Sequence, residues 1–158
     1  MIKNPLSYLK KRHLLWAMNF WPPLVGAGIK VKVINRDLTD VLVTMKQRFW
    51  NTSFVSRHFG GSLYVMTDPF YMIMLLEVLG KGSSVIDKAA SIRYLKPAKG
   101  KVSARFYLSK EEVKKIKLKL ESTEGAFEWS FEVPITSEGG QVVAVVSKTL
   151  SLKNYKKR

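Results

Sequence analysis

Residues 60–80 read GGSLYVMTDPFYMIMLLEVLG, and this stretch decides the fold. From Ser62 to Leu79 the side chains are apolar on nearly all sides, which predicts a helix that is buried all round. Gly80 follows the last apolar residue and ends the pattern. Because carboxylates at Asp68 and Glu77 interrupt the run, it is a poor membrane span. We therefore expect the core helix of a globular fold.

The segments on either side of this helix alternate apolar and polar residues with a period of two, as half-buried strands do. Residues 29–33 and 41–46 are separated by a polar turn, and they predict an antiparallel hairpin ahead of the helix. Four further strands are expected after it, at 84–96, 102–108, 127–133 and 142–152. Within this second half, Ser109 and Glu112 have capping-box spacing and predict a short surface helix. The order indicates an α+β fold in which a curved antiparallel sheet of about six strands wraps the long central helix.

The N-terminal region carries its own helical pattern. Residues 5–20 place apolar side chains at helical spacing with basic residues between them, and Trp21-Pro22-Pro23 ends the pattern. We expect an extra amphipathic helix in a helical extension over residues 1–23. We expect it to pack its apolar side on the domain, or to act as a substrate lid or membrane-surface helix. No linker or repeat divides the chain, so we expect one domain over residues 1–158, with a charged tail at 153–158.

The charge balance is strongly basic, with 27 Lys and Arg against 12 Asp and Glu, and a formal net charge of +15. Such a surface attracts nucleic acid, anionic membrane or a phosphorylated ligand, or serves solubility alone. The absence of cysteine excludes disulfides, thiolate catalysis and cysteine-based zinc sites. The two histidines have no spacing that predicts a triad or metal cluster, so we expect no metal and no cofactor. With no secretory pattern in the first residues, we expect a cytoplasmic protein.

The start of the central helix combines residues that suit acyl chemistry. Gly60 and Gly61 would expose backbone N–H groups at a positive helix end, where a thioester carbonyl gains an oxyanion-stabilising donor. Asp68 follows Gly61 by seven residues and would be a candidate base. Each feature also has a plainer interpretation. Asp68-Pro69 is a common helix start in which the aspartate is the N-cap, and a glycine pair is a common turn.

A family resemblance bears on these alternatives. Asn51, the segment His58-Phe59-Gly60-Gly61-Ser62-Leu63 and Thr67-Asp68 resemble the hotdog-fold thioesterases of the phenylacetate-degradation type. Those enzymes begin the central helix with His-Gly-Gly and direct water with an acid seven residues after the second glycine. Residues 19–23, 58–64 and 68–71 resemble more closely a hotdog family of unknown function, over nearly the whole chain. The resemblance implies a hotdog domain that forms a homodimer, or a dimer of dimers, with an acyl-thioester site between subunits.

The resemblance also implies roles for individual residues. The catalytic group comprises Asp68, which activates water or acts as nucleophile, with Gly60 and Gly61 at the carbonyl and Asn51 or His58 positioning the substrate. The residues expected in substrate binding are Phe59, Ser62, Tyr64, Arg93 and Lys96, the last two because a basic surface could receive the phosphates of CoA. The chain departs from the thioesterase motif at three positions. Phe59 stands where those enzymes have the histidine, Ser53 where they have an asparagine, and Ser56 where they have a loop glycine.

Two functions from different classes stay open. The first is an acyl-CoA thioesterase-like protein that hydrolyses or binds acyl thioesters at a dimer-interface site. The second is a non-catalytic lipid or acyl-chain binding module that associates with anionic membrane surfaces through its basic patches and N-terminal helix. Nucleic-acid binding is not expected, because Phe127, Trp129 and Phe131 fit a core or interface better than a base-stacking surface.

Overall fold

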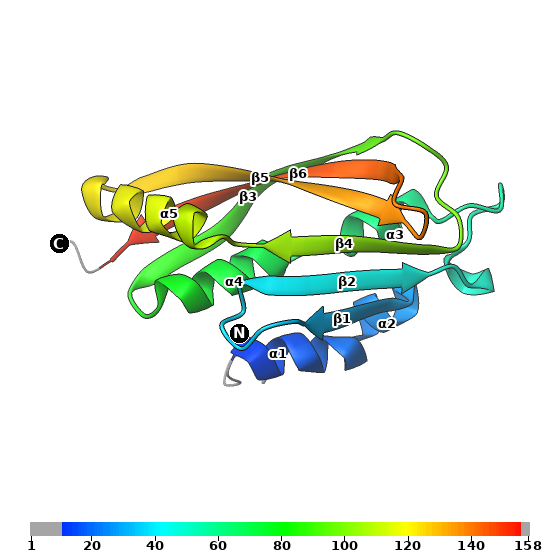
Figure 1. The fold of residues 1–158 in the computed structure, drawn as a ribbon, viewed down its shortest axis with the longest axis horizontal. Helices are drawn as coiled ribbons and strands as arrows, with labels where there is room; N and C mark the ends of the chain where they lie inside the picture. The colour runs from blue at the N-terminus through cyan, green and yellow to red at the C-terminus, as the bar shows by residue number, and fades with distance from the viewer. Residues whose placement is uncertain (1–10, 156–158) are drawn as a thin grey trace, which may run out of the picture.

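The computed structural model describes residues 11–155, in which one curved antiparallel sheet wraps a central helical segment (Figure 1). Its elements are α1 (Lys11–Ala17), η2 (Met18–Phe20), α2 (Pro22–Ala27), β1 (Ile29–Val33), β2 (Asp40–Lys46), η3 (Phe49–Asn51), α3 (Gly60–Val65), α4 (Phe70–Leu79), β3 (Ser83–Tyr94), β4 (Lys101–Tyr107), α5 (Lys110–Ser122), β5 (Ala126–Ser137) and β6 (Val142–Asn154). The six strands run in the order β1-β2-β4-β5-β6-β3. This is the hotdog architecture, and it confirms the predicted α+β fold. The first residues of the predicted N-terminal helix, 5–10, lie outside the described residues, as do residues 156–158 of the predicted tail.

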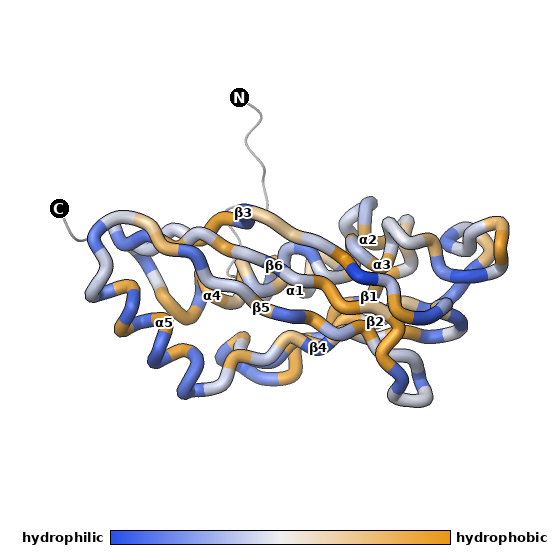
Figure 2. Tube along the Cα trace, turned by 90° about the horizontal axis from the view of Figure 1, so that it is seen from above, coloured by the Kyte–Doolittle hydropathy of each residue, from blue (hydrophilic) through white to orange (hydrophobic). Residues whose placement is uncertain are grey.

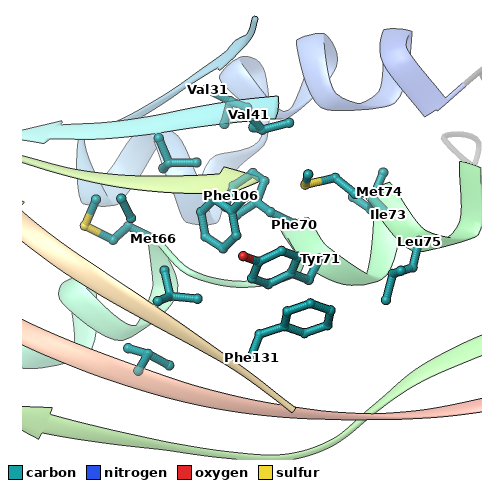
Figure 3. Close-up of a cluster of buried hydrophobic side chains, with 14 of the residues drawn as sticks. Val31, Val41, Met66, Phe70, Tyr71, Ile73, Met74, Leu75, Phe106 and Phe131 are labelled. Atoms are coloured by element: carbon teal, nitrogen blue, oxygen red, sulfur yellow. The ribbon is translucent and has the colours of Figure 1, made fainter. Parts of the chain in front are cut away.

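Alternation along the strands explains which face of the sheet receives the helix. In β2 the side chains of Val41, Val43 and Met45 are buried, and they share the inner face with alternate residues of β4. The helix α4 places Tyr71 against this face, where its ring stacks on Phe131 with centroids 4.0 Å apart (Figure 3). By length and hydropathy alone, the 20-residue stretch Gly60–Leu79 would suffice to cross a membrane. Here its helices fill the concave side of the sheet and form the core.

The central helical segment is divided at the point where the acid lies. The helix α3 ends at Val65 and α4 begins at Phe70, with a turn between them. Pro69 lacks the N–H that a continuous helix would need, and the Thr67 hydroxyl donates to the Tyr64 carbonyl at 2.7 Å, which closes α3. The N-cap of α4 is Pro69, with no side-chain capping bond. The interpretation of Asp68 as a helix cap is therefore wrong, and its carboxylate is available for other contacts.

The two edges of the sheet differ in what covers them. At β1, the Asn19 side chain imitates a neighbouring strand, because its Nδ2 donates to the Val31 carbonyl at 3.0 Å and its Oδ1 accepts from the Val31 N–H at 2.8 Å. The helices α1 and α2 lie along the same edge (Figure 1). The other edge is β3, which pairs with β6 on one side only within the described residues. Seen from above, α5 lies at one end of the molecule, and loops of mixed hydropathy lie at the other (Figure 2).

Candidate functional site

A groove of about 540 Å³ opens beside the start of α3. Its walls come from α2, the loop after η3, and α3 itself. The lining residues are Pro23, Gly26, Ala27, Trp50, Asn51, Thr52, Ser53, Phe54, Phe59, Gly61, Ser62 and Val65. A side chain at position 61 would not fit beside Phe59, because a Cβ there would lie 2.6 Å from Phe59 Cε1. The groove is therefore a largely apolar surface that meets a helix N-terminus.

The helix start supplies hydrogen-bond donors to this groove. The first N–H groups of a helix have no partner within the helix. Ser62 and Leu63 donate to the Phe59 carbonyl at 3.0 and 3.3 Å, whereas Gly60 and Gly61 donate to no acceptor among the described residues. The Tyr94 hydroxyl donates to the Gly60 carbonyl at 3.1 Å, so the end of β3 lies against the same helix start. Two N–H groups at a positive helix end are thus available to an oxygen atom in the groove.

Asn51 fastens the groove together. Its side chain is buried, and its Nδ2 donates to the carbonyls of Ala27 at 2.9 Å and Lys46 at 3.0 Å. Its Oδ1 accepts from the Arg48 N–H at 2.6 Å, and its backbone carbonyl accepts from the Phe59 N–H at 3.1 Å. Both amide hydrogens are therefore occupied by backbone carbonyls. Asn51 sets the position of α3 relative to α2 and β2, and substrate contact from its amide nitrogen would require breaking these bonds.

His58 fastens a second segment to the helix start. Its backbone N–H donates to the Ala98 carbonyl at 3.0 Å, and its Nε2 lies 2.9 Å from the Gly100 carbonyl. Because a carbonyl only accepts, Nε2 carries the proton in this contact. The Nδ1 atom is buried and has no partner among the described residues. Burial lowers the pKa of His58 below 6.5 and outweighs the opposing effect of the Gly100 bond. His58 is thus a neutral histidine that ties the loop between β3 and β4 to the groove.

Asp68 lies at the opposite end of α3, beside a buried cation that the sequence patterns did not reveal. Its Oδ1 accepts a hydrogen bond from Lys148 Nζ at 2.5 Å. The same Nζ lies 3.0 Å from Asp87 Oδ1 in β3. Burial lowers the pKa of Lys148, but the hydrogen bonds and charges of Asp68 and Asp87 outweigh it, so the pKa is raised above 10.5. In the sequence, only the strand phase of Lys148 indicates that it points inward. Residue 148 has the same phase as the buried Val146 and Leu150 in β6, where an apolar side chain is expected.

The remaining predicted residues divide into two groups. Phe59 is more than half exposed and lines the groove with Ser62, whereas Tyr64 is half-buried and is not among the lining residues. Arg93 pairs with Glu132 at 3.5 Å on the surface, and Lys96 is exposed in the loop that follows β3. Arg93 has the opposite strand phase from Tyr94, whose hydroxyl contacts the helix start, and Lys96 follows Tyr94 by two residues. Within the described residues, no cluster of three metal-ligating side chains occurs.

The lowered pKa of His58 predicts that the free energy of unfolding depends on pH. A group whose pKa is lowered in the folded state binds more protons when unfolded, so folding stability falls once pH drops below the unfolded value of 6.5. We expect the free energy of unfolding to decrease between about pH 7 and pH 5, where few other side chains titrate. His58→Gln keeps a donor for Gly100 and should flatten this dependence in urea denaturation series. His13→Gln, at an exposed histidine, should leave it unchanged. An identical slope in the wild type and His58→Gln would contradict this assignment.

Comparisons with solved structures and families agree with this architecture. A protein of unknown function from Pseudomonas aeruginosa, described as a "probable thioesterase", has a TM-score of 0.78 and 20% identity over 92% of this chain and 97% of that chain. The PaaI protein of the phenylacetic acid degradation operon of E. coli has a TM-score of 0.61 and 15% identity, covering 89% and 91%. At these identities the likeness shows the fold. No curated protein matches the sequence. A family model described as a domain of unknown function, DUF4442, matches residues 10–152, and the chain therefore belongs to this family of hotdog proteins.

Proposed function

We propose that this protein binds acyl-CoA-like thioesters and hydrolyses them at a site shared by two subunits. The observation that carries the proposal is the largely apolar groove lined by Gly61, at a helix start where the N–H groups of Gly60 and Gly61 have no acceptor among the described residues. An acyl chain fits the apolar walls, and the thioester carbonyl would accept hydrogen bonds from the helix start. Such donors stabilise the negative charge that develops on the oxygen during hydrolysis. The solved neighbours that are named as thioesterases support the same reaction class.

The separation of Gly61 and Asp68 indicates that one chain does not supply both groups to one substrate. Gly61 lies in the first turn of α3, and Asp68 lies seven residues later, in the turn that follows the helix end at Val65. At about 1.5 Å of rise per residue, the helix and this turn separate them by roughly 10 Å. An oxyanion donor and a water-directing acid each act within about 3 Å of the reacting atoms. We therefore propose that the helix start of one subunit works with Asp68 of a second copy.

The unpaired edge at β3 is the surface on which the second copy would dock. This strand has 12 residues, and a long edge strand with free N–H and C=O groups is normally shielded. Ile86 is 59% exposed, and the residues near the middle of the strand are small and exposed. Tyr94 at one end contacts the helix start, and Asp87 near the other end contacts Lys148 beside Asp68. Antiparallel pairing of two β3 strands about a twofold axis would bring each helix start toward the other subunit's acid.

The remaining residues have supporting roles in this proposal. Asp68 directs or activates the water that attacks the thioester carbonyl, while Asn51 and His58 hold the walls of the groove in place. Arg93 and Lys96, exposed on either side of Tyr94 in the chain, would meet the phosphates of CoA. No cofactor is required for this hydrolysis. A cytoplasmic location, where acyl-CoA is available, is part of the same proposal.

Substitution of Asp68 tests the reaction directly. The measurement is hydrolysis of a panel of acyl-CoA chain lengths by the wild type, Asp68→Asn and Asp37→Asn. Loss of the acid should lower kcat/KM by about 100-fold or more, which is the usual contribution of a positioned base. Asp37 is an exposed aspartate in the turn between β1 and β2, so its substitution should leave the rate unchanged. Circular dichroism and thermal unfolding confirm that each variant is folded. Full activity in folded Asp68→Asn would refute the role of the acid.

A second candidate function is association with anionic membranes. Phe49 and Phe54 are almost fully exposed in and after η3, with Trp50 55% exposed beside them. Trp50 also lines a groove of about 720 Å³ whose basic residues are Lys30, Lys46, Arg48 and Lys101. Exposed aromatic side chains next to cations suit the boundary between lipid headgroups and acyl chains. The protein would then carry or sense acyl chains without hydrolysing thioesters.

Vesicle co-sedimentation tests this candidate. If the surface formed by Phe49, Trp50 and Phe54 binds membranes, the protein should pellet with vesicles rich in phosphatidylserine but not with pure phosphatidylcholine, and high salt should release it. The double variant Phe49→Ser/Phe54→Ser should weaken binding by about tenfold or more, because it removes two exposed aromatic anchors. Tyr155→Ser, at an exposed aromatic residue after β6, is the matched control. Equal pelleting of all three proteins, or none with either lipid, would exclude this membrane-binding surface.

A further inference from the structure

Lys148 is a buried cation in a place where the strand pattern calls for an apolar residue. Its side chain is 3% exposed, and its neighbours in register are Ala90 of β3 and Phe131 of β5. The charged groups that face it are Asp68, from the turn between α3 and α4, and Asp87, from β3. Lysine is rarely buried to this degree, because removing an ammonium ion from water is costly. A buried lysine at a position where the strand pattern predicts an apolar residue indicates a functional site.

The contact between Lys148 and Asp68 leaves half of the carboxylate available. Lys148 Nζ holds Oδ1, while Oδ2 has no hydrogen-bond partner among the described residues. The Asp68 side chain is 45% exposed even though the ammonium ion beside it is buried. Asp87 lies against the same nitrogen, which restrains the lysine side chain from the β3 side. One oxygen is therefore fixed, and the other can receive a proton from water.

We propose that Lys148 is the positioning residue of the thioester site, holding one oxygen of Asp68 so that its second oxygen faces the attacking water. This inference rests on the hydrolytic function proposed above and adds a residue to it. An adjacent cation favours the charged form of a carboxylate, and a hydrogen bond to one oxygen limits rotation of the group. Lys148 touches neither substrate nor water in this account, and it acts through Asp68 alone.

The ionisation of Asp68 is measurable without turnover. The chain has four aspartates, so aspartate-selective carboxyl labelling with ¹³C gives four signals, and Asp68→Asn identifies the one that matters. In Lys148→Met the Asp68 signal should move on protonation at a pH that is about one unit or more higher than in the wild type, since the partner cation is gone. Lys148→Arg keeps the charge and should stay near the wild type. Lys153→Met removes an exposed lysine from the same strand and should have no effect.

The pH profile of hydrolysis gives the second readout. In Lys148→Met the acid limb of kcat/KM should move to higher pH, so activity at acidic pH falls about tenfold or more, with partial recovery as pH rises. A loss of the same size at every pH would indicate a structural role only and would overturn the proposal. So would an Asp68 signal that titrates identically in the wild type and Lys148→Met.

Two further comparisons keep the test decisive. Lys148→Met leaves Asp68 and Asp87 without their shared cation. If this single variant does not fold, the double variant Lys148→Met/Asp87→Asn is compared with Asp87→Asn instead. The same displacement of the Asp68 signal is expected in that pair. If the wild type hydrolyses no thioester while the signal moves as described, the hydrolytic function fails and the effect of Lys148 on Asp68 stands. If hydrolysis occurs and the signal does not move, the inference about Lys148 fails alone.

Discussion

One buried ammonium ion joins segments of this protein that are far apart in the chain. Lys148 in β6 binds Asp68, at the break between α3 and α4, and Asp87, in the edge strand β3. Removing one partner leaves a charge without compensation, which is costly where that charge is the buried ammonium ion. The position of the helix break, the acid and the free edge of the sheet are therefore coupled. A substitution at any of these three residues is expected to change the contacts of the other two.

The same constraint explains why the two halves of the candidate site lie apart. The donors of Gly60 and Gly61 are set at one end of α3 by Asn51 and His58, which bind backbone groups of α2, β2 and the loop before β4. The acid is set at the other end by Lys148. Both ends are anchored to the sheet, so they are not expected to approach each other by a small movement. The proposed docking of a second copy along β3 would resolve this separation without any change inside one subunit.

Much of the fold follows from local patterns. The period-two strands, the all-apolar helix and the Ser109 cap are present as expected, since each depends on residues close together in the chain. Spacing and resemblance single out the glycine pair and Asp68 as candidate site residues. The contacts around them cannot be predicted in this way, because they join distant segments. Nothing near Asn51 in sequence indicates that Ala27 occupies its amide, and only the phase of β6 hints that Lys148 points inward.

The central claim is that the helix start of one subunit and the acid of another form one site. Differently tagged Asp68→Asn and Gly61→Val chains, co-expressed and purified as a mixed dimer, test it most directly. Each parent homodimer should be inactive, because every site lacks one group. In the mixed dimer one of the two sites recovers an intact Gly61 and an intact Asp68, so about half of the wild-type hydrolysis should return, as twofold symmetry requires. An inactive mixed dimer, from folded chains whose wild type hydrolyses thioesters, would show that each site lies within one chain and would contradict this account.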